Sequence, residues 1–378
     1  MNQQQKIVHV SSVHQARDNR ILHRECRSLA EAGFAVTLIA HAEWDGAQHG
    51  VSVRALPAPR GGRLRRMTRT VWQAFRMALA ERGDAYHLHD PELLPVGLAL
   101  KALGKRVVFD SHEHVADQIR TKPWIPSALR VPVATIYAAM ERAAARAFDA
   151  IVVATPRIAE AFPGRQPVIV QNFPRAEELS DTEATPYSAR GNVAAYVGGI
   201  TELRGIVEMI RAMEIAGKRH EVTLKLGGTF APAELEAQAR AEPGWRHVDA
   251  LGWLGRDDVA RVLDQSRMGL VVFLPAPNHA ESQPTKLFEY MAASLPVVAS
   301  DFPHWRQFVT EIGSGLMVDP RDPRAIADAI TWLLEHPAEA EAMGERGRQA
   351  VLERFTWERE AEKLVELYRT RVFSSNGG

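Results

Sequence analysis

Two glutamates stand on either side of a lysine in the segment NHAESQPTKLFEYMAASLPVVAS, at Glu281, Lys286 and Glu289. The segment predicts a loop and then a helix. The free N–H groups of a helix start form an anion site, to which Lys286 adds a full positive charge. Glu289 falls roughly 7–8 Å beyond the helix start at about 1.5 Å per residue, which matches the reach from a pyrophosphate to ribose hydroxyls. Glu281 precedes the helix, where it can point at a sugar.

The same segment also has a purely structural interpretation. Pro284 fits the first helical position, with Gln283 or Ser282 before it as the cap. Lys286 and Glu289 would then share the helix face turned away from the sheet, as a surface pair worth only about 0.2–0.5 kcal/mol. The spacing alone favours neither interpretation.

A second candidate for phosphate binding is GGITELR, from Gly198 to Arg204. Glycines let the backbone approach a phosphate closely, and the guanidinium of Arg204 offers a fork of donors. Without Arg204, Gly198 and Gly199 would indicate only an ordinary turn from strand to helix.

Histidines and acids end two predicted strands of the first half, in HLHDPELLP and FDSHEHVAD. Alternation puts His87 and His89 on one face of their strand, and His112 and His114 on one face of theirs. Two functions remain open for these clusters. They could bind a metal ion, as in a hydrolase, or they could bind sugar hydroxyls and help a proton leave an acceptor.

Contacts to an acceptor are expected from residues beside these clusters and in the first loop, namely His89, Asp90, Glu113 and Arg20. His87 and His114 are expected to be structural. Asp18, just before Arg20, is expected to cap the first helix.

A basic stretch lies between Gly46 and Ala80, with seven arginines and no acidic residue. Its apolar positions include Leu64, Met67 and Trp72, and six of its seven arginines fall within Arg60–Arg76. Such a helix can lie on an anionic membrane surface, or it can be a core helix with one solvated face.

Strands and helices must alternate to position these residues. Short β-branched runs begin at Lys6, Ala35, Tyr86, Arg106, Ala150 and Val168, and again at Val193, Val222, Val248, Met268, Pro296 and Gly315. Helical spacing between them predicts two doubly wound parallel sheets that face each other across a cleft. A polar stretch from Pro174 to Asn192 reads as the linker. The expected domains are 1–178 and 179–357, followed by a helix over 358–378 that packs back on the first domain or closes the second.

The overall composition narrows the class. Lys+Arg and Asp+Glu are 46 each, so no general attraction to nucleic acid is expected. The one cysteine, Cys26, cannot form an internal disulfide, which fits a reducing cytoplasm. The sequence shows neither a signal peptide nor an apolar run long enough for a membrane span, so a cytoplasmic protein is expected.

Taken together, the motif Glu281-SQPTKLF-Glu289, the following EYMAASLPVVASDFP and GSGLMVDP, and the upstream YVGGITELRGIVEMIRAM resemble the family-four retaining glycosyltransferases of GT-B fold. The resemblance covers essentially the whole chain. It implies that Lys286 contacts the donor diphosphate, that Glu289 holds the ribose, and that Glu281 and His112 lie beside the transferred sugar. It also implies donor contacts at Gly198, Gly199, Arg204, Gly228, Ser282 and Thr285. One departure stands out, because family members often carry Arg or Lys where Gly199 and Ile200 stand.

The resemblance implies a retaining, metal-independent transfer from a UDP- or GDP-sugar, with no further cofactor, to a glycan or a lipid-linked acceptor. The setting would be bacterial polysaccharide or glycolipid synthesis at the inner face of the cell membrane. Three alternatives remain: a sugar-nucleotide epimerase or hydrolase of the same fold, a metal hydrolase built on the histidine clusters, and a non-catalytic binding protein.

Overall fold

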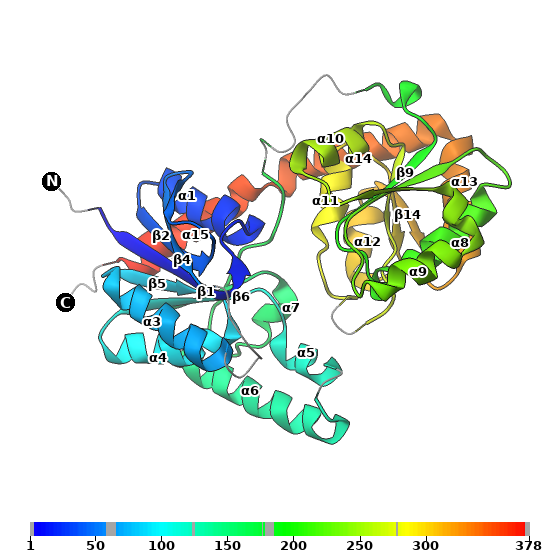
Figure 1. The fold of residues 1–378 in the computed structure, drawn as a ribbon. Helices are drawn as coiled ribbons and strands as arrows, with labels where there is room; N and C mark the ends of the chain where they lie inside the picture. The colour runs from blue at the N-terminus through cyan, green and yellow to red at the C-terminus, as the bar shows by residue number, and fades with distance from the viewer. Residues whose placement is uncertain are drawn as a thin grey trace. The chain divides into compact units, whose positions relative to one another are not determined.

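The computed structural model describes residues 4–57, 66–122, 125–175, 177, 185–276 and 279–374. The chain forms two compact units (Figure 1). Met1–Asn172 and Trp357–Gly378 make the first, and Phe173–Thr356 makes the second. The boundaries therefore fall at 172/173 and 356/357, where the sequence suggested 178/179 and 357/358. The C-terminal helix groups with the first unit.

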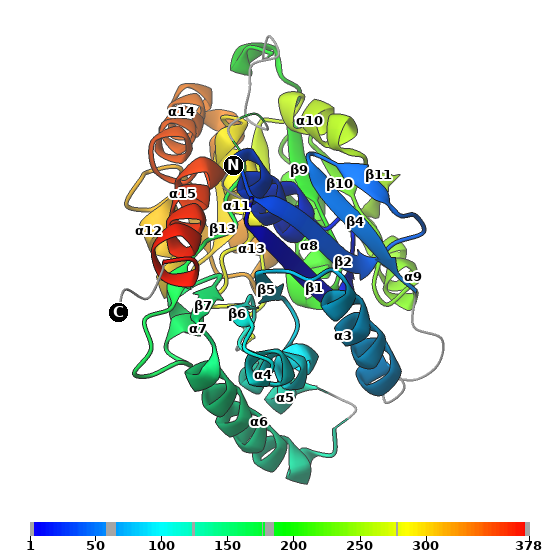
Figure 2. The same cartoon turned by 90° about the vertical axis from the view of Figure 1, so that its left-hand side faces the viewer.

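The first unit is built on one sheet, in the order β3-β4-β2-β1-β5-β6-β7-β8. Adjacent strands of this sheet run parallel, except that β3 and β4 are antiparallel to each other. The order β4-β2-β1 can be followed in Figure 2. The strands are β1 (Lys6–Gln15), β2 (Ala35–His41), β3 (Gly46–Gln48), β4 (Val51–Leu56), β5 (Ala85–Leu88), β6 (Arg106–Ser111), β7 (Ala150–Val153) and β8 (Val168–Ile169). The predicted parallel sheet is confirmed, and the strands β3 and β4 add to it.

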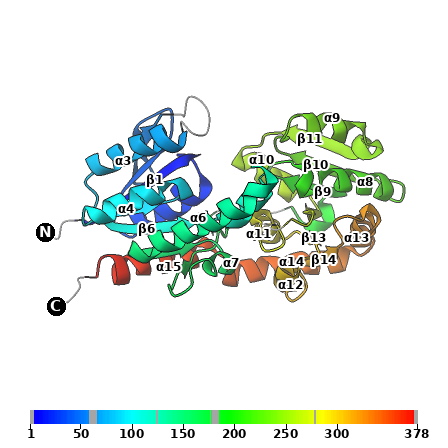
Figure 3. The same ribbon diagram turned by 90° about the horizontal axis from the view of Figure 1, so that it is seen from below.

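Helices cover both faces of this sheet. One face packs against η1 (Asn19–Cys26), α1 (Arg27–Glu31), α15 (Trp357–Leu367) and η8 (Tyr368–Val372). The other packs against α3 (Val71–Ala80), α4 (Leu94–Ala102) and α6 (Ser127–Ala147), and Figure 3 shows α6 running beside α4. The shorter elements are η2 (Arg66–Thr70), η3 (Pro91–Leu93), α5 (Val115–Thr121) and α7 (Pro156–Ala159).

The first unit needs α15 and η8 to complete its core. Trp357 is fully buried and donates its indole N–H to Ser28 Oγ at 2.8 Å. Tyr368 is also fully buried, and its hydroxyl lies 2.9 Å from His87 Nδ1 on β5. These two large aromatic side chains fasten residues far apart in the sequence to one sheet face.

The second unit is a parallel sheet in the order β11-β10-β9-β12-β13-β14. Its strands are β9 (Val193–Val197), β10 (Thr223–Gly227), β11 (Val248–Gly252), β12 (Met268–Val271), β13 (Val297–Ser300) and β14 (Gly315–Val318). The helices are α8 (Ile206–Ala216), α9 (Glu234–Ala241), α10 (Arg256–Asp264), α11 (Thr285–Ala292), α12 (Pro303–Val309), α13 (Pro323–Glu335) and α14 (Pro337–Arg354). Short 3-10 turns are η5 (Tyr187–Ala189), η6 (Glu202–Arg204) and η7 (Pro243–His247).

Two cores, one on each face, hold the second unit together. Side chains of α8 and α13 fill one face, and those of α11, α12 and α14 fill the other. The Tyr290 ring of α11 packs where any side chain on Gly269 would clash, since a Cβ there would come within 2.2 Å of the ring. The Tyr290 hydroxyl accepts the Val197 N–H at 2.9 Å. Tyr290 thereby ties α11 to the carboxyl end of β9.

Candidate functional site

In the second unit, glycines shape the turns that follow β9 and β10. Gly198 has φ +129° and Gly228 has φ +145°, a backbone region that other residues rarely adopt. A Cβ on Gly228 would stand 2.0 Å from the Gly198 carbonyl oxygen, so the two turns can touch only because Gly228 lacks a side chain. The exposed backbone at these strand ends is where ligands of doubly wound sheets bind.

The side chain of Lys286 packs against the Gly198 turn. A Cβ on Gly198 would be 3.1 Å from its Nζ, and the ammonium sits 3.9 Å from the centre of the Tyr196 ring. Lys286 is only 6% exposed, and among the residues that the structure describes its Nζ has no hydrogen-bond acceptor. The surface-pair interpretation of Lys286 is therefore wrong.

Burial sets the charge state of this lysine. Loss of solvent, followed by repulsion from Arg204, lowers the pKa of Lys286 to about 7, and Glu289 opposes that shift. A buried ammonium without an acceptor is costly, and an anion at this position would relieve the cost. The arrangement points to a phosphate-sized ligand.

Arg204 adds a second cation at the same turn. Its Nη1 donates to the Gly199 carbonyl at 2.9 Å, and its guanidinium carbon lies 5.7 Å from the Phe273 ring centre. The Tyr196 hydroxyl donates to the same carbonyl at 2.8 Å. Gly198, Gly199, Arg204 and Lys286 are thus brought together, as the sequence predicted.

The start of α11 differs in detail from the prediction. The helix begins at Thr285, with Pro284 one residue earlier as the N-cap and with no side-chain cap. Ser282 cannot cap it because its hydroxyl donates to the His279 carbonyl at 2.8 Å, while its own carbonyl accepts the Trp305 indole N–H at 2.7 Å. Thr285 lies half-buried in the first turn. Trp305 therefore holds the loop, and the helix start keeps its backbone donors for another partner.

The two glutamates have different surroundings. Glu289 is half-buried one turn after Lys286, and Glu281 is exposed in the turn before the helix. Burial lowers the pKa of His304, and the nearby Glu281 carboxylate opposes this. His304 Nε2 is buried and has no hydrogen-bond partner within the described ranges. His304 was not among the predicted site residues, although it directly follows the recognisable ASDFP run.

In the first unit, His112 lies just past the end of β6. Its Nδ1 is 2.9 Å from Asp110 Oδ2, and its side chain is 17% exposed. A second histidine, His14 on β1, lies 3.1 Å from Asp90 Oδ1 and packs edge-on against the His112 ring at 5.6 Å. The hydrogen bond to Asp90 raises the pKa of His14. Two imidazoles, each beside a carboxylate, thus lie against each other. Only one of them, His112, was predicted as a site residue from the sequence.

Three predicted acceptor contacts are corrected by burial. Asp90 is 1% exposed and accepts hydrogen bonds from Ser12 N at 2.6 Å and Ser11 Oγ at 2.9 Å. His89 is 2% exposed, and its two ring nitrogens lie against Asp110 and His9. Both side chains position their neighbours and cannot touch an acceptor.

Arg20 is the third correction. It is 6% exposed, and its guanidinium donates to Asp110 at 3.0 and 3.2 Å and to the Val170 carbonyl at 2.8 Å. These contacts commit it to the interior of the unit. Asp18 caps η1 as predicted, accepting from Arg20 N and Ile21 N at 2.9 Å each. Glu113 alone of the four predicted acceptor contacts is exposed.

The remaining histidines of the two clusters are structural, as predicted. His87 is fully buried against Tyr368, and His114 caps α5 by accepting from Asp117 N at 3.3 Å. A hydrolase built on these clusters would need ligands that its substrate can reach. Since His87 and His89 have no exposed side-chain surface, that alternative loses its support.

Two helices of the first unit expose apolar side chains. In η2 and α3, Met67 and Trp72 are 52% and 59% exposed, whereas Val71, Phe75 and Leu79 of the same predicted apolar stripe are partly buried against the core, so only part of the stripe faces the core. Arg60, Arg63 and Leu64 lie outside the described residues. On α6, an apolar face at helical spacing is 39–61% exposed and comprises Leu129, Val133, Ile136 and Met140. Within the described ranges, the helices are too short or too polar to cross a membrane.

Comparison with known proteins identifies the family. The model of glycosyl transferases group 1 matches residues 181–350, and that of the glycosyl transferase 4-like domain matches residues 19–169. D-inositol 3-phosphate glycosyltransferase from Corynebacterium urealyticum is 41% identical over 100 residues, which are 26% of this chain. The chain spans only 23% of that relative's length.

Solved structures of other proteins superpose on nearly the whole length of this chain. Sucrose-phosphate synthase from Thermosynechococcus elongatus superposes with a TM-score of 0.75 at 20% identity, covering 97% of this chain and 98% of that one. HepE from Anabaena, in complex with UDP and glucose, gives 0.73 at 15% identity, covering 97% and 100%. These likenesses show the fold, and the family models cover most of both units. The chain belongs to the group 1 glycosyltransferases and has their two-domain GT-B fold.

Proposed function

We propose that the protein moves a sugar from a UDP- or GDP-sugar to a glycan or lipid-linked acceptor, with retention at the anomeric carbon and without a metal. The observation that carries this proposal is the buried ammonium of Lys286 beneath the Gly198 turn, with Arg204 beside it. A pocket with two cations at a strand end, preorganised before any ligand arrives, suits a diphosphate. The solved HepE complexes with UDP support a uridine nucleotide as the first donor to test.

Transfer of the sugar requires that the negative charge on the departing diphosphate be stabilised. The bond between the sugar C1 and the diphosphate oxygen breaks, and a bond from the acceptor oxygen forms on the same face of the ring. The acceptor proton leaves toward the departing phosphate. Many sugar transferases place a metal ion on the diphosphate through an Asp-x-Asp motif, which this sequence lacks. Lys286, Arg204 and the α11 N–H groups take that role in our proposal.

At the sugar, we assign Glu281 and His112 separate roles. Glu281 is exposed at the loop before α11 and would position the sugar or stabilise its developing positive charge. His112 would contact the donor sugar. Asp110 at 2.9 Å from its Nδ1 fixes the orientation of the ring and leaves Nε2 for a hydroxyl.

The ribose role of Glu289 gives a direct test. Replacing Glu289 with Ala should weaken binding of UDP or GDP about tenfold, because two hydrogen bonds to ribose hydroxyls are lost. Calorimetry with the ribonucleotide and with its 2′,3′-dideoxy analogue isolates this contact. The wild type should prefer the ribonucleotide, and Glu289→Ala should bind both equally weakly. A variant that keeps the preference would show that another residue holds the ribose.

The transferase is distinguished from an epimerase or hydrolase by its need for an acceptor. Purified protein is incubated with UDP- and GDP-sugars, with and without a membrane glycolipid extract, and released nucleoside diphosphate is measured. Release that depends on the extract supports transfer. Equal release in water alone would indicate hydrolysis, and sugar isomerisation without release would indicate an epimerase.

A lipid-linked acceptor implies contact with the inner face of the membrane. The exposed apolar face of α6 and the exposed arginines Arg69 and Arg76 of the η2–α3 segment support this part of the proposal. Replacing Ile136 and Met140 with Glu should reduce binding to phosphatidylglycerol vesicles about tenfold or more in a sedimentation assay, since charge opposes insertion.

The matched control for that experiment is Thr135→Glu, which adds charge to an exposed position of α6 outside the apolar face. It should leave most of the vesicle binding intact. Equal loss in both variants would mean that charge alone, rather than the apolar face, decides binding, and no binding by the wild type would remove the membrane from the proposal.

A further inference from the structure

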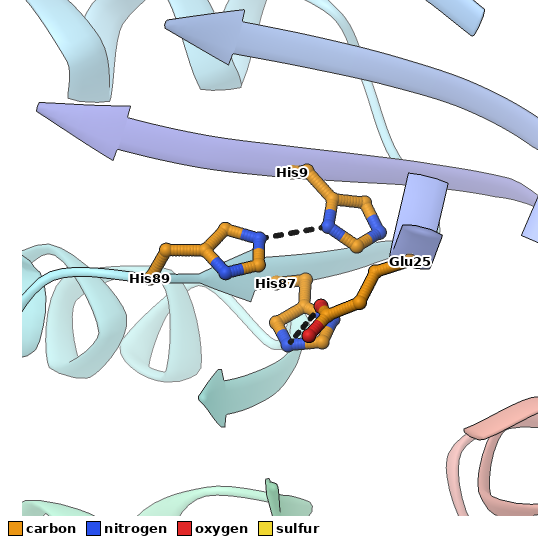
Figure 4. A group of neighbouring side chains, drawn as sticks. All are labelled: His9, Glu25, His87 and His89. Carbon is orange, nitrogen blue, oxygen red and sulfur yellow. Dashed lines mark hydrogen bonds and ion pairs between the residues drawn. The ribbon is translucent and has the colours of Figure 1, made fainter. Parts of the chain in front are cut away.

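A group of buried histidines lies inside the first unit, away from solvent. His9 and His87 are register partners on β1 and β5, and His87 and His89 are two residues apart, so all three side chains point to one sheet face. Glu25 of η1 covers that face (Figure 4). His9, Glu25 and His87 are 0% exposed and His89 is 2% exposed. One ligand atom from each lies within 4.8 Å of the others.

The hydrogen bonds of the group decide where its lone pairs are. Both rings are buried, where the uncharged form of an imidazole is favoured. Asp110 is an acceptor, so His89 Nδ1, 3.2 Å away, carries a proton and donates it. His89 Nε2 is then an acceptor and takes the proton of His9 Nδ1 at 2.9 Å. His9 Nε2 is left as a bare lone pair.

In the part of the chain that the structure describes, other nitrogen and oxygen atoms around His9 Nε2 are also without hydrogen-bond partners. His9 Nε2, His87 Nε2 and both Glu25 carboxyl oxygens are buried and lack hydrogen-bond partners of acceptable geometry among the described residues. When His87 Nδ1 donates to the Tyr368 hydroxyl, 2.9 Å away, the lone pair of His87 is on Nε2, which lies 3.8 Å from Glu25 Oε2. Buried polar atoms of native proteins are normally satisfied, so a shared set of lone pairs indicates an absent positive centre.

The charge balance leads to the same conclusion. Arg20 is the cation beside the group, with Nε 2.9 Å from Glu25 Oε1. The same guanidinium also donates to Asp110 at 3.0 and 3.2 Å. One guanidinium therefore faces two carboxylates. The group needs one more positive charge, from a proton on Glu25 or from a metal ion.

We propose that this group is a structural site for a divalent transition metal of the zinc class, held by His9 Nε2, His87 Nε2 and the Glu25 carboxylate. Imidazole and carboxylate are ligands that zinc prefers, and neutral imidazole is the form that binds it. The outer contacts are those that metal-bound histidines usually have, since His89 holds His9 and Tyr368 holds His87. The metal would tie η1 to β1 and β5, and the site is separate from the donor pocket of the second unit.

The test uses the full-length chain, stripped of metal with a chelator and then dialysed. Addition of Co²⁺ should give the visible absorption of a tetrahedral nitrogen and oxygen site, saturating at one ion per chain, and Zn²⁺ should displace it. Zn²⁺ should also raise the melting temperature. A folded chain that binds neither ion at this stoichiometry would overturn the proposal and leave a proton on Glu25 as the positive centre.

Variants locate the ion. His87→Gln and Glu25→Gln should each lower Zn²⁺ affinity by about 100-fold or more, and the outer-contact variant His89→Gln by about 10–100-fold. The control is His41→Gln, because His41 is also buried in this unit but its ring nitrogens lie against the Leu56 and Ser12 carbonyls at 3.1 and 2.7 Å. It should bind Zn²⁺ like the wild type. Loss of Zn²⁺ in His112→Gln with retention in His87→Gln would assign the metal to the His89, Asp110 and His112 group and refute the site proposed here.

Discussion

Replacement of Lys286 by Met is expected to lower kcat/KM about 100- to 1000-fold while making the ligand-free protein more stable. The loss follows because the ammonium meets the charge of the departing diphosphate, and one such preorganised donor contributes a factor of about 10²–10³. The gain follows because Met fills nearly the same volume without a buried charge. Activity is measured by nucleoside diphosphate release, and stability by thermal unfolding without ligand.

The stability difference should also depend on pH. The pKa of Lys286 is about 7 in the folded protein against 10.5 for a free lysine. Between these two pH values the unfolded chain holds more protons at this position, so the free energy of unfolding of the wild type rises with pH. The advantage of Lys286→Met should therefore be largest below pH 7 and shrink toward pH 10.5. An equal advantage at all pH values would contradict the buried ammonium.

Donor binding should show the opposite trend. A diphosphate binds the protonated lysine, so the affinity of the wild type for UDP or GDP should fall as pH rises above about 7, approaching tenfold per unit. Lys286→Met should bind weakly with no such slope. Calorimetry in buffers of different ionisation enthalpy should also detect proton uptake by the wild type near pH 8.

Glu281→Gln is expected to lower kcat about 100-fold or more with little change in the affinity for free nucleoside diphosphate. The carboxylate is exposed in the loop before α11, whereas the diphosphate contacts that we propose are those of Lys286 and Arg204. Loss of a charge that acts only on the developing oxocarbenium ion reduces turnover and spares ground-state binding.

The measurement for Glu281 separates the two quantities. Single-turnover transfer gives the chemical step, and calorimetry with UDP or GDP gives binding. His304 of α12 lies near Glu281, so His304→Gln is the comparison that shows whether a change at this neighbour alone lowers turnover. If Glu281→Gln loses nucleotide affinity as strongly as turnover, its role is to shape the donor pocket and not to act at the sugar.

Much of the fold was predictable because buried parallel strands are continuous apolar runs. Strands starting at Lys6, Val193 and Val297 lie within one residue of the predicted runs. The strands β3 and β4 were not predicted, although Val51 and Val53 alternate with polar residues. The arginines that follow them led us to interpret the whole stretch as part of a basic helix. Period-two alternation was the available signal.

The grouping of glycines and cations beyond the end of β9 was predictable for the same local reason. Gly198, Arg204 and Lys286 belong to short motifs whose geometry is set by one turn and one helix start. The burial of the polar residues at the strand ends of the first unit was not predictable, because it depends on contacts over long sequence separations. Arg20 is buried by Asp110, 90 residues away, and His87 by Tyr368, 281 residues away. No local pattern shows that a polar strand end will be covered by the last helix.

The return of α15 to the first unit has a consequence for the order of folding. During synthesis, Trp357 and Tyr368 leave the ribosome only after all of Phe173–Thr356. The second unit is continuous in sequence and can close its own sheet, while the first waits with an open apolar face that these two aromatic side chains will later fill. The unit that is begun first is therefore the one completed last, and in the interval its uncovered face is the part of the nascent chain most exposed to aggregation or chaperone binding.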